Sequence, residues 1–250
     1  MSQAITEPAL AQRALAGLFE THSNVVFFGG AGVSTASGIP DFRSQDGLYS
    51  QRFAYPPEAM LSHGFYESHR PEFYDFYREK MIALDAKPNA CHLKLAELER
   101  AGVLSTVVTQ NIDGLHQAAG SRAVYELHGS VHRNICRSCG AVYDAAWIMA
   151  REHDDARGVP VCPACGGSIK PDVVLYEEPL DEGVIDGAVR AISQADALII
   201  GGTSLVVYPA AGLTRFFQGD SLVIVNHDPT PQDERADLLI SCDIAQAFEF

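Results

Sequence analysis

Near-continuous apolar runs recur along the chain and predict the strands of a buried parallel sheet. They lie at residues 24–28, 105–109, 124–127, 195–201, 221–226 and 237–240. Strands that are buried on both faces lose the alternation of apolar and polar residues that a half-exposed sheet shows. Helices are expected between these strands. The pattern therefore predicts an α/β fold with a Rossmann-like, doubly wound parallel sheet.

Helical spacing of apolar residues predicts one helix before each of the first two strands. Leu10, Leu15 and Leu18 predict an amphipathic helix within residues 7–20, and residues 89–101 predict a second helix. Residues 44–87, which lie between the two regions, are rich in aromatic residues and helix breakers, and we expect a loop followed by short helices. Residues 131–178 interrupt the α/β pattern and form an insert with a helix around residues 143–151.

Composition narrows the classes of partner. The 250 residues carry a formal net charge of −14, so a general nucleic-acid binder or a protein attracted to anionic membranes is not expected. A basic partner such as a lysine-rich peptide fits better. The sequence has no apolar run of roughly 18 residues and no cationic segment leading into an apolar one near its beginning, which favours a cytoplasmic location.

Four of the six cysteines form two CxxC pairs separated by 22 residues. They are Cys136, Cys139, Cys162 and Cys165. Two disulfides or a redox pair are the alternatives, but one pair would suffice for redox work and a cytosolic disulfide is rare. Two such turns can close a tetrahedral site around Zn²⁺, and four thiolates leave no open position for chemistry. A structural zinc site is therefore expected, with Cys91 and Cys242 as buried small hydrophobes.

Residues 29–43, reading GGAGVSTASGIPDFR, follow the first strand and suggest backbone brought close to a phosphate. The dinucleotide fingerprint also needs a third glycine and an acidic residue about 20 positions later, and Gly30 and Gly32 are followed by neither. An ordinary glycine-rich turn therefore remains open from these residues alone.

Two polar segments, residues 109–116 and 126–130, each follow a predicted strand, where doubly wound sheets bind ligands. His128 stands at a strand end beside Gly129, and from spacing alone a catalytic and a structural role are equally open. His116 can be a structural residue at the start of a helix.

Several ordered motifs together resemble the sirtuin family of NAD-dependent protein lysine deacylases, of the bacterial type. They are GAGVSTASGIPDFR, TQNIDGLHQAAG, ELHGS, the two CxxC pairs, GGTSLVVYPA and VIVN. The resemblance runs from about Val25 to Asp243. It implies that NAD is consumed as a co-substrate, that zinc is structural, and that an acyl-lysine protein or peptide is the substrate. The expected products are nicotinamide and O-acetyl-ADP-ribose.

The resemblance also implies a role for each matching residue. His128 matches the catalytic base, and Asn111 is expected to be catalytic as well. Contacts to NAD are implied for Gly30, Ala31, Gly32, Ser34, Thr35, Asp41, Phe42, Arg43, Gln110, Asn111, Ile112, Asp113, His128, Gly202, Thr203, Ser204, Asn226, Asp243 and Ile244. Contacts to the substrate are implied for Val174, Leu175, Tyr176, Glu177, Leu205 and Val206. Asn226 on a later strand would then hold the adenosine ribose in place of the missing carboxylate.

The implied chemistry suits these residue types. After the bond between nicotinamide and ribose breaks, the acyl oxygen of the substrate attacks the sugar. His128 then takes a proton from the ribose hydroxyls so that the 2′-oxygen attacks the imidate carbon. An imidazole with an ordinary pKa near 6.5 can do this at neutral pH.

The chain departs from the family pattern at the expected peptide groove. It has Tyr176-Glu177-Glu178 where the family usually has Phe-Gly-Glu. The Glu177 side chain either narrows the groove and adds charge that favours basic substrates, or points into solvent.

Acyl preference is the second departure. Relatives that prefer succinyl groups carry a tyrosine and an arginine three residues apart, whereas Tyr74 and Tyr77 stand here, followed by Arg78. We favour acetyl-lysine, with other uncharged acyl groups possible. A mono-ADP-ribosyltransferase and a non-catalytic NAD or ADP-ribose sensor remain as alternatives, and the presence of both Asn111 and His128 favours deacylation.

These predictions divide the chain into three parts. Residues 1–45, 88–130 and 179–250 form the Rossmann-like NAD-binding domain. Residues 46–87 form a helical module with the cofactor loop, and residues 131–178 form the zinc-binding module with its four cysteines.

Overall fold

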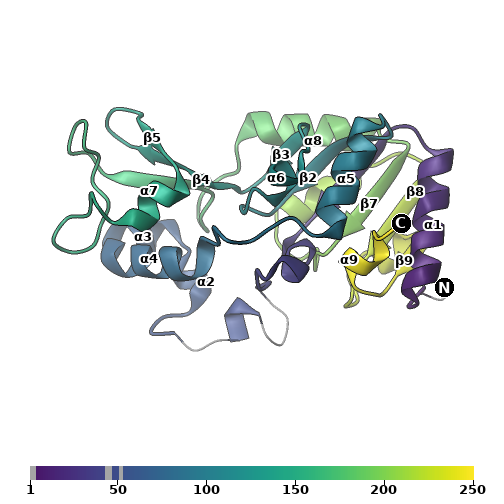
Figure 1. The fold of residues 1–250 in the computed structure, drawn as a ribbon, viewed down its shortest axis with the longest axis horizontal. Helices are drawn as coiled ribbons and strands as arrows, with labels where there is room; N and C mark the ends of the chain where they lie inside the picture. Colours follow the sequence, from purple (N-terminus) through teal and green to yellow (C-terminus); the bar gives the residue numbers. More distant parts are fainter. Residues whose placement is uncertain (1–3, 43–46, 51–52) are drawn as a thin grey trace.

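A six-stranded sheet, parallel throughout, forms the larger half of the molecule. The structure is a computed structural model and describes residues 4–42, 47–50 and 53–250. The strand order is β3-β2-β1-β7-β8-β9 (Figure 1). The strands are β1 (Val25–Gly29), β2 (Leu104–Thr109), β3 (Val124–Glu126), β7 (Ala197–Gly201), β8 (Ser221–Val225) and β9 (Leu238–Ile240). The predicted Rossmann-like sheet is confirmed.

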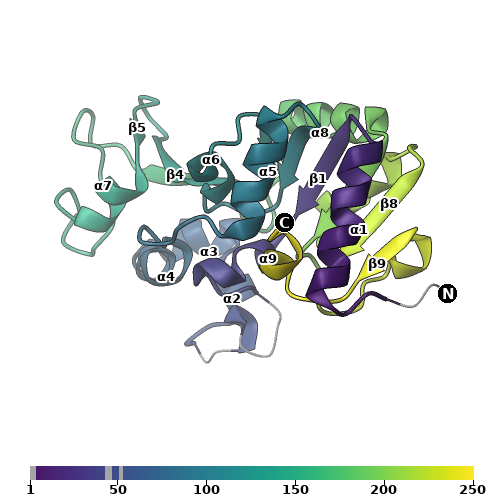
Figure 2. The ribbon, with the colours of Figure 1, turned by 45° about the vertical axis from the view of Figure 1, so that its right-hand side comes forward.

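Helices cover both faces of this sheet, as Figures 1 and 2 show. One face packs against α1 (Pro8–Thr21), α5 (Ala90–Arg100) and α9 (Ile244–Ala247). The other face packs against α8 (Glu182–Gln194) and the 3-10 helix η5 (Ala210–Phe216).

Neighbouring residues of one strand enter different cores. Phe27 packs in the core under α1 and Phe28 in the core under α8, because successive side chains of a strand point to opposite faces. Both faces are therefore apolar, as the near-continuous runs predicted.

One leucine in each of the two predicted helices is exposed. Leu10 of α1 is 42% exposed and Leu93 of α5 is 52% exposed. The buried stripe of α1 instead runs through Ala11, Leu15 and Leu18. The sheet contacts only a narrow part of each helix, so an apolar residue at the margin of the stripe remains in solvent.

The smaller half of the molecule combines the helical module and the cysteine-containing insert, at the end away from the chain termini (Figure 1). Its helices are α2 (Pro57–Met60), α3 (His63–Ser68), α4 (Arg70–Phe76), the π-helix η4 (Tyr77–Met81) and α7 (Ala145–Ala150). Its antiparallel sheet, in the order β5-β4-β6, comprises β4 (Gly129–Cys136), β5 (Val142–Tyr143) and β6 (Ile169–Val173).

The helical module and the insert share one hydrophobic core. The hydroxyls of Tyr66 and Tyr74 both donate to the carbonyl oxygen of Ile169 in β6, each at 2.7 Å. The guanidinium of Arg78 donates to the carbonyl oxygens of Ile148 and Gly158. The two modules are separate in the sequence and packed together in space.

The remaining short helices lie between the elements already described. They are α6 (Leu115–Ala119) and the 3-10 helices η1 (Ala31–Val33), η2 (Thr35–Ser37), η3 (Leu48–Ser50) and η6 (Asp233–Arg235). Within the described residues, no helix has the length and apolar character needed to cross a membrane.

Candidate functional site

A cavity of about 570 Å³ opens at the carboxyl ends of β1 and β7. The strand order reverses between these two strands, and ligands of doubly wound sheets bind at such a switch point. The lining includes most of the residues singled out from the sequence. They are Gly30, Ala31, Gly32, Ser34, Thr35, Asp41, Phe42, Gln110, Asn111, Ile112, Asp113, His128, Val174, Leu175, Tyr176, Glu177, Gly202, Thr203, Ser204, Asn226, Asp243 and Ile244.

The two glycine turns of the cavity pack directly against each other. A Cβ on Gly30 would lie 2.6 Å from Cβ of Thr203, and one on Gly32 would lie 2.9 Å from Cα of Gly202. The amide of Gly32 also donates to the carbonyl oxygen of Gly202 at 2.8 Å. The glycines are therefore required for contact between the turns, a reason that the sequence pattern did not reveal.

Behind these turns, three polar side chains form a connected network. The hydroxyl of Ser34 donates to Oδ2 of Asp113 at 2.6 Å, and Nδ2 of Asn111 donates to that hydroxyl oxygen at 3.1 Å. The other oxygen of Asp113 accepts from the amide of Leu115 at 2.9 Å, at the start of α6. Ser34 and Asn111 are both buried. The network fixes the side chain of Asn111 at the cavity wall.

His128 follows β3 and lines the same cavity. Its Nδ1 lies 2.9 Å from the carbonyl oxygen of Gln110, and Nε2 of Gln110 donates to Oγ1 of Thr203 at 3.0 Å. A carbonyl can only accept, so Nδ1 carries the proton and Nε2 of the neutral ring keeps its lone pair. Burial lowers the pKa of His128, and the hydrogen bond to Gln110 offsets only part of this effect. The ring is therefore neutral at neutral pH.

Residues 174–178 form one wall of the cavity and are attached to both neighbouring modules. The amide of Val174 donates to the carbonyl oxygen of His128 at 3.0 Å. The amide of Tyr176 donates to the carbonyl oxygen of Leu61 at 2.9 Å, and the amide of His63 donates to the carbonyl oxygen of Tyr176 at 3.0 Å. This wall is thus a short strand-like pairing with the residues just before α3.

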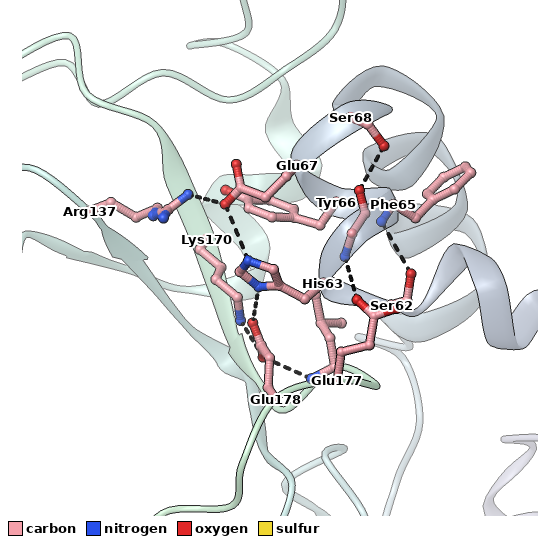
Figure 3. Close-up of polar contacts among 12 residues, drawn as sticks. Ser62, His63, Phe65, Tyr66, Glu67, Ser68, Arg137, Lys170, Glu177 and Glu178 are labelled. Carbon is pink, nitrogen blue, oxygen red and sulfur yellow. Dashed lines mark hydrogen bonds and ion pairs between the residues drawn. The ribbon is translucent and has the colours of Figure 1, made fainter.

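Glu178 stabilises the same wall through its side chain (Figure 3). Its carboxylate contacts Nδ1 of His63 at 2.8 Å and accepts from Nζ of Lys170 at 3.0 Å and from the amide of Leu175 at 2.9 Å. Burial raises the pKa of Glu178, but these hydrogen bonds outweigh burial and the net shift is downward. Glu178 is therefore charged and holds the turn closed.

The Glu177 side chain combines features of the two alternatives, a position in the groove and a position in solvent. It is exposed and lines the cavity, yet its Oε2 accepts from the amide of Gly64 at 2.9 Å. Its φ of +76° lies in the left-handed region, which explains why glycine is usual in the family at this position. The carboxylate contacts the first turn of α3 and compensates part of the strain.

Two residues expected to contact the substrate, Leu205 and Val206, do not belong to the cavity lining. The side chain of Leu205 is buried in the core beneath α8, with φ at +55°, so it does not line the cavity. Val206 is 47% exposed and also lies outside the lining, whereas Val207 and Tyr208 belong to it. The left-handed backbone of Leu205 turns the chain sharply. As a result, the residues that face the cavity are Val207 and Tyr208, one or two positions later than expected.

Two other expectations concern the far end of the cavity and the cofactor loop. Asn226 donates through Nδ2 to the carbonyl oxygen of Asp228 at 2.7 Å. Asp243 accepts from the amide of Gln246 at 2.9 Å and caps α9. Arg43 lies outside the described residues.

Sequence reasoning missed several lining residues, among them Lys80, Met81, Tyr49 and Cys242. Lys80 and Met81 end the π-helix η4, and no pattern in the sequence marks them as close to a ligand site. Cys242 is buried, as expected, and also faces the cavity. Tyr49 lies on the loop that was expected to cover NAD. Its closeness to Phe42 in the sequence could have identified Tyr49 as a lining residue.

The four cysteines of the insert converge on one point, with all four sulfurs within 4.8 Å of one another. The Sγ atoms of Cys136 and Cys165 are 3.5 Å apart, and those of Cys139 and Cys162 are 3.7 Å apart. Zn–S bonds in a tetrahedron place sulfurs about 3.8 Å apart. The Tyr143 hydroxyl donates to Cys162, which lowers the pKa of this thiol to about 6 and favours a thiolate. The cluster fits structural zinc.

Comparisons with known proteins agree with this geometry. Residues 30–209 match the Sir2 family. The NAD-dependent protein deacetylase of Clostridium acetobutylicum is 58% identical over 229 residues, which cover 91% of this chain and 92% of that protein. The corresponding deacetylase of Clostridium perfringens is 54% identical over 92% of this chain and 93% of its own.

Solved structures show the same fold. A Sir2 structure with a p53 peptide and NAD⁺ is 39% identical, with a TM-score of 0.82 and coverage of 95% of both chains. A Sir2 variant with a deacetylated p53 peptide and 3′-O-acetyl ADP ribose is 38% identical, with a TM-score of 0.87 and the same coverage. The chain therefore belongs to the Sir2 family.

Proposed function

We infer that the protein is an NAD-dependent protein deacetylase and that His128 is its catalytic base. The observation that carries this assignment is the protonation state of His128, whose Nδ1 proton is held by the carbonyl of Gln110 while the ring lines the cavity. A neutral imidazole with a free lone pair at Nε2 is the form that a general base needs.

The cavity fits NAD by its size and by its groups. Its volume of about 570 Å³ lies in the range of cofactor sites. The two turns around Gly32 and Gly202 bring backbone close to the space where a pyrophosphate can bind, and Asn226, which follows β8, lines the same cavity and is available for a ribose. When bound, NAD supplies the ribose carbon to which the acyl oxygen is transferred as nicotinamide leaves.

The chain's own residues prepare this transfer. The connected side chains of Ser34, Asn111 and Asp113 present fixed polar groups for the nicotinamide end. His128 accepts a proton from a ribose hydroxyl at Nε2, and the carbonyl of Gln110 stabilises the imidazolium that forms. The side chain of Gln110 donates to Thr203 on the second glycine turn. This hydrogen bond links the position of His128 to the turn that is proposed to bind phosphate.

The substrate in this proposal is a protein or peptide with an acetylated lysine, bound between residues 174–177 and residues 206–208. An extended peptide that lies between two backbone edges can add hydrogen bonds on both sides. Acidic acyl groups are disfavoured because Arg78 is buried against Asp154 at 2.7 Å, away from the cavity. A cytoplasmic location belongs to the same proposal, since thiolate metal ligands persist in a reducing compartment.

One assay tests the function and its rivals together. The protein is incubated with NAD and an acetyl-lysine peptide, and nicotinamide, peptide mass and ADP-ribose products are followed by mass spectrometry. We expect deacetylated peptide and O-acetyl-ADP-ribose in equal amounts. Transfer of ADP-ribose to protein would instead assign a transferase, and binding of NAD without turnover would assign a sensor.

A further inference from the structure

Tyr176 is joined to two different parts of the site. Its backbone pairs with Leu61 and His63 at the start of α3, and Figure 3 shows the polar contacts that attach the following residues, Glu177 and Glu178, to the same region. Its side chain is 39% exposed and lines the cavity. The backbone of Tyr176 therefore belongs to the peptide-binding wall, and its ring extends away from it.

The hydroxyl of Tyr176 reaches Tyr49, 127 positions away in the sequence, with the two oxygen atoms 2.8 Å apart. The usual family residue at position 176 is phenylalanine, which lacks this hydroxyl. The bond is therefore available only because this chain departs from the pattern.

Tyr49 in turn contacts the loop expected to cover NAD. Its ring meets that of Phe42 edge-on, with centroids 5.6 Å apart, and its amide donates to the carbonyl oxygen of Phe42 at 2.9 Å. Phe42 and Tyr49 both line the cavity. The peptide wall and the NAD loop are thus connected through Tyr176, Tyr49 and Phe42.

We propose that Tyr49 and Tyr176 are positioning residues whose hydroxyl–hydroxyl bond couples NAD binding to peptide binding. The proposal rests on the proposed function, because it takes residues 174–177 as the peptide wall and Phe42 as a contact of NAD. A ligand that orders one partner of the bond lowers the cost of ordering the other, so each ligand increases affinity for the second.

The experiment measures binding without turnover. The dissociation constant of an acetyl-lysine peptide is determined by calorimetry with and without saturating ADP-ribose, and the ratio of the two constants is the coupling factor. Tyr176→Phe and Tyr49→Phe each remove one hydroxyl and keep the ring. We expect either variant to reduce the coupling factor about 2- to 10-fold, as loss of one partly exposed hydrogen bond implies. The double variant should show no further loss.

Tyr55→Phe is the matched control. Tyr55 belongs to the same module and is 41% exposed, and no described residue accepts a hydrogen bond from its hydroxyl. This variant should keep the coupling factor of the original protein. A coupling factor that is unchanged in Tyr176→Phe, or losses from the two single variants that add, would overturn the proposal.

Steady-state kinetics test the proposal in a second way, because a purely structural role of Tyr176 would not change the KM for NAD alone. Tyr176→Phe should raise the KM for NAD and keep kcat at saturation of both substrates. A protein that binds both ligands but never deacetylates the peptide would refute the proposed function alone, since the coupling factor is measured without catalysis.

Discussion

The imidazole of His128, the proposed base, shows how one backbone carbonyl can fix the tautomer of a buried ring. Gln110 accepts the Nδ1 proton, and burial favours the uncharged ring. Both effects leave Nε2 as the basic atom. The chemistry at this site therefore depends on the tautomer of one ring, and that tautomer depends on the turn that carries Gln110.

Replacement of the base should abolish most of the activity. We expect His128→Ala to lower kcat for deacetylation about 10²- to 10⁴-fold, the usual range for loss of a general base. The measurement is the rate of deacetylated peptide formation at saturating NAD. His153→Ala is a suitable control, because His153 is exposed, its ring stacks on Trp147 and it lies outside the cavity lining. Wild-type rates in His128→Ala would exclude the assignment.

The pH dependence should follow the lowered pKa of His128. The neutral ring is the active form, so activity is lost as the pH falls through the pKa and the ring becomes protonated. Because burial lowers this pKa from 6.5, the acid limb of kcat/KM should have its midpoint below pH 6.5. A midpoint above pH 7 in the rate profile would contradict the burial argument.

At the scale of elements, the π-helix η4 connects the helical module to the zinc-binding module. Arg78 extends from this helix into the insert, where it is 3% exposed and donates to Ile148, Gly158 and Asp154. Tyr74 and Tyr77 of the same segment are buried with it. These three residues are therefore buried in the smaller unit and do not belong to the cavity lining.

Arg78→Lys separates a role in packing from a role in acyl selectivity. A lysine cannot make all three hydrogen bonds, so we expect the free energy of unfolding to fall by about 1–3 kcal/mol, as judged by chemical denaturation. The ratio of activities on acetyl and succinyl peptides should stay the same. Arg157→Lys, at an exposed pair with Asp155, should change stability by less than about 0.5 kcal/mol. A gain or loss of succinyl activity in Arg78→Lys would place Arg78 at the acyl site.

Considered as a whole, the molecule has a large sheet domain and a smaller unit whose core contains residues from two distant segments. Among the described residues, the four-cysteine cluster lies in the second unit. Because the helical module packs in the same core, the influence of zinc should extend beyond the insert and reach the peptide wall through α3.

Removal of the metal tests this shared core. The purified protein should contain about one zinc per chain, because four thiolates bind one ion. Chelation should raise amide exchange in β4 and α3 and leave β1 and β8 protected, as followed by mass spectrometry. Cys139→Ser should lose zinc, whereas Cys91→Ala, outside the cluster, should keep it. A zinc-free protein with native exchange in β4 would refute the structural role.

Two buried histidines should make the whole protein sensitive to acid. Burial lowers the pKa of His116 to about 3 and that of His92 to about 4, and neither nitrogen of His116 has a hydrogen-bond partner among the described residues. The unfolded chain protonates both near pH 6.5. Their contribution to stability is therefore complete above pH 6.5 and is lost as the pH falls toward 4 and 3.

His116→Leu should make this loss smaller. Each histidine accounts for up to about 1.4 kcal/mol per pH unit, so the variant should lose about 2 kcal/mol less than the original protein between pH 6.5 and pH 5. Denaturation curves at the two pH values measure the difference. Equal losses in both proteins would show that other groups govern acid unfolding.

The sequence by itself determined the local features of this protein. Apolar runs identified the central strands β1, β7 and β8, because a strand buried on both faces has few polar positions to interrupt it, and the shorter runs at residues 105–109, 124–127 and 237–240 located the other three. The CxxC spacing predicted that the four cysteines converge, since each pair forms one tight turn. Linear motifs likewise named most residues of the cavity.

Only the tertiary structure determined which of those residues contact one another. It showed that Gly30 and Gly32 pack against a second turn, that Leu205 is buried, and that Arg78 supports the insert. It also brought Tyr49 to Tyr176. These contacts join segments far apart in the chain, and no local pattern encodes which distant side chain occupies a given space, because that depends on how the complete elements pack.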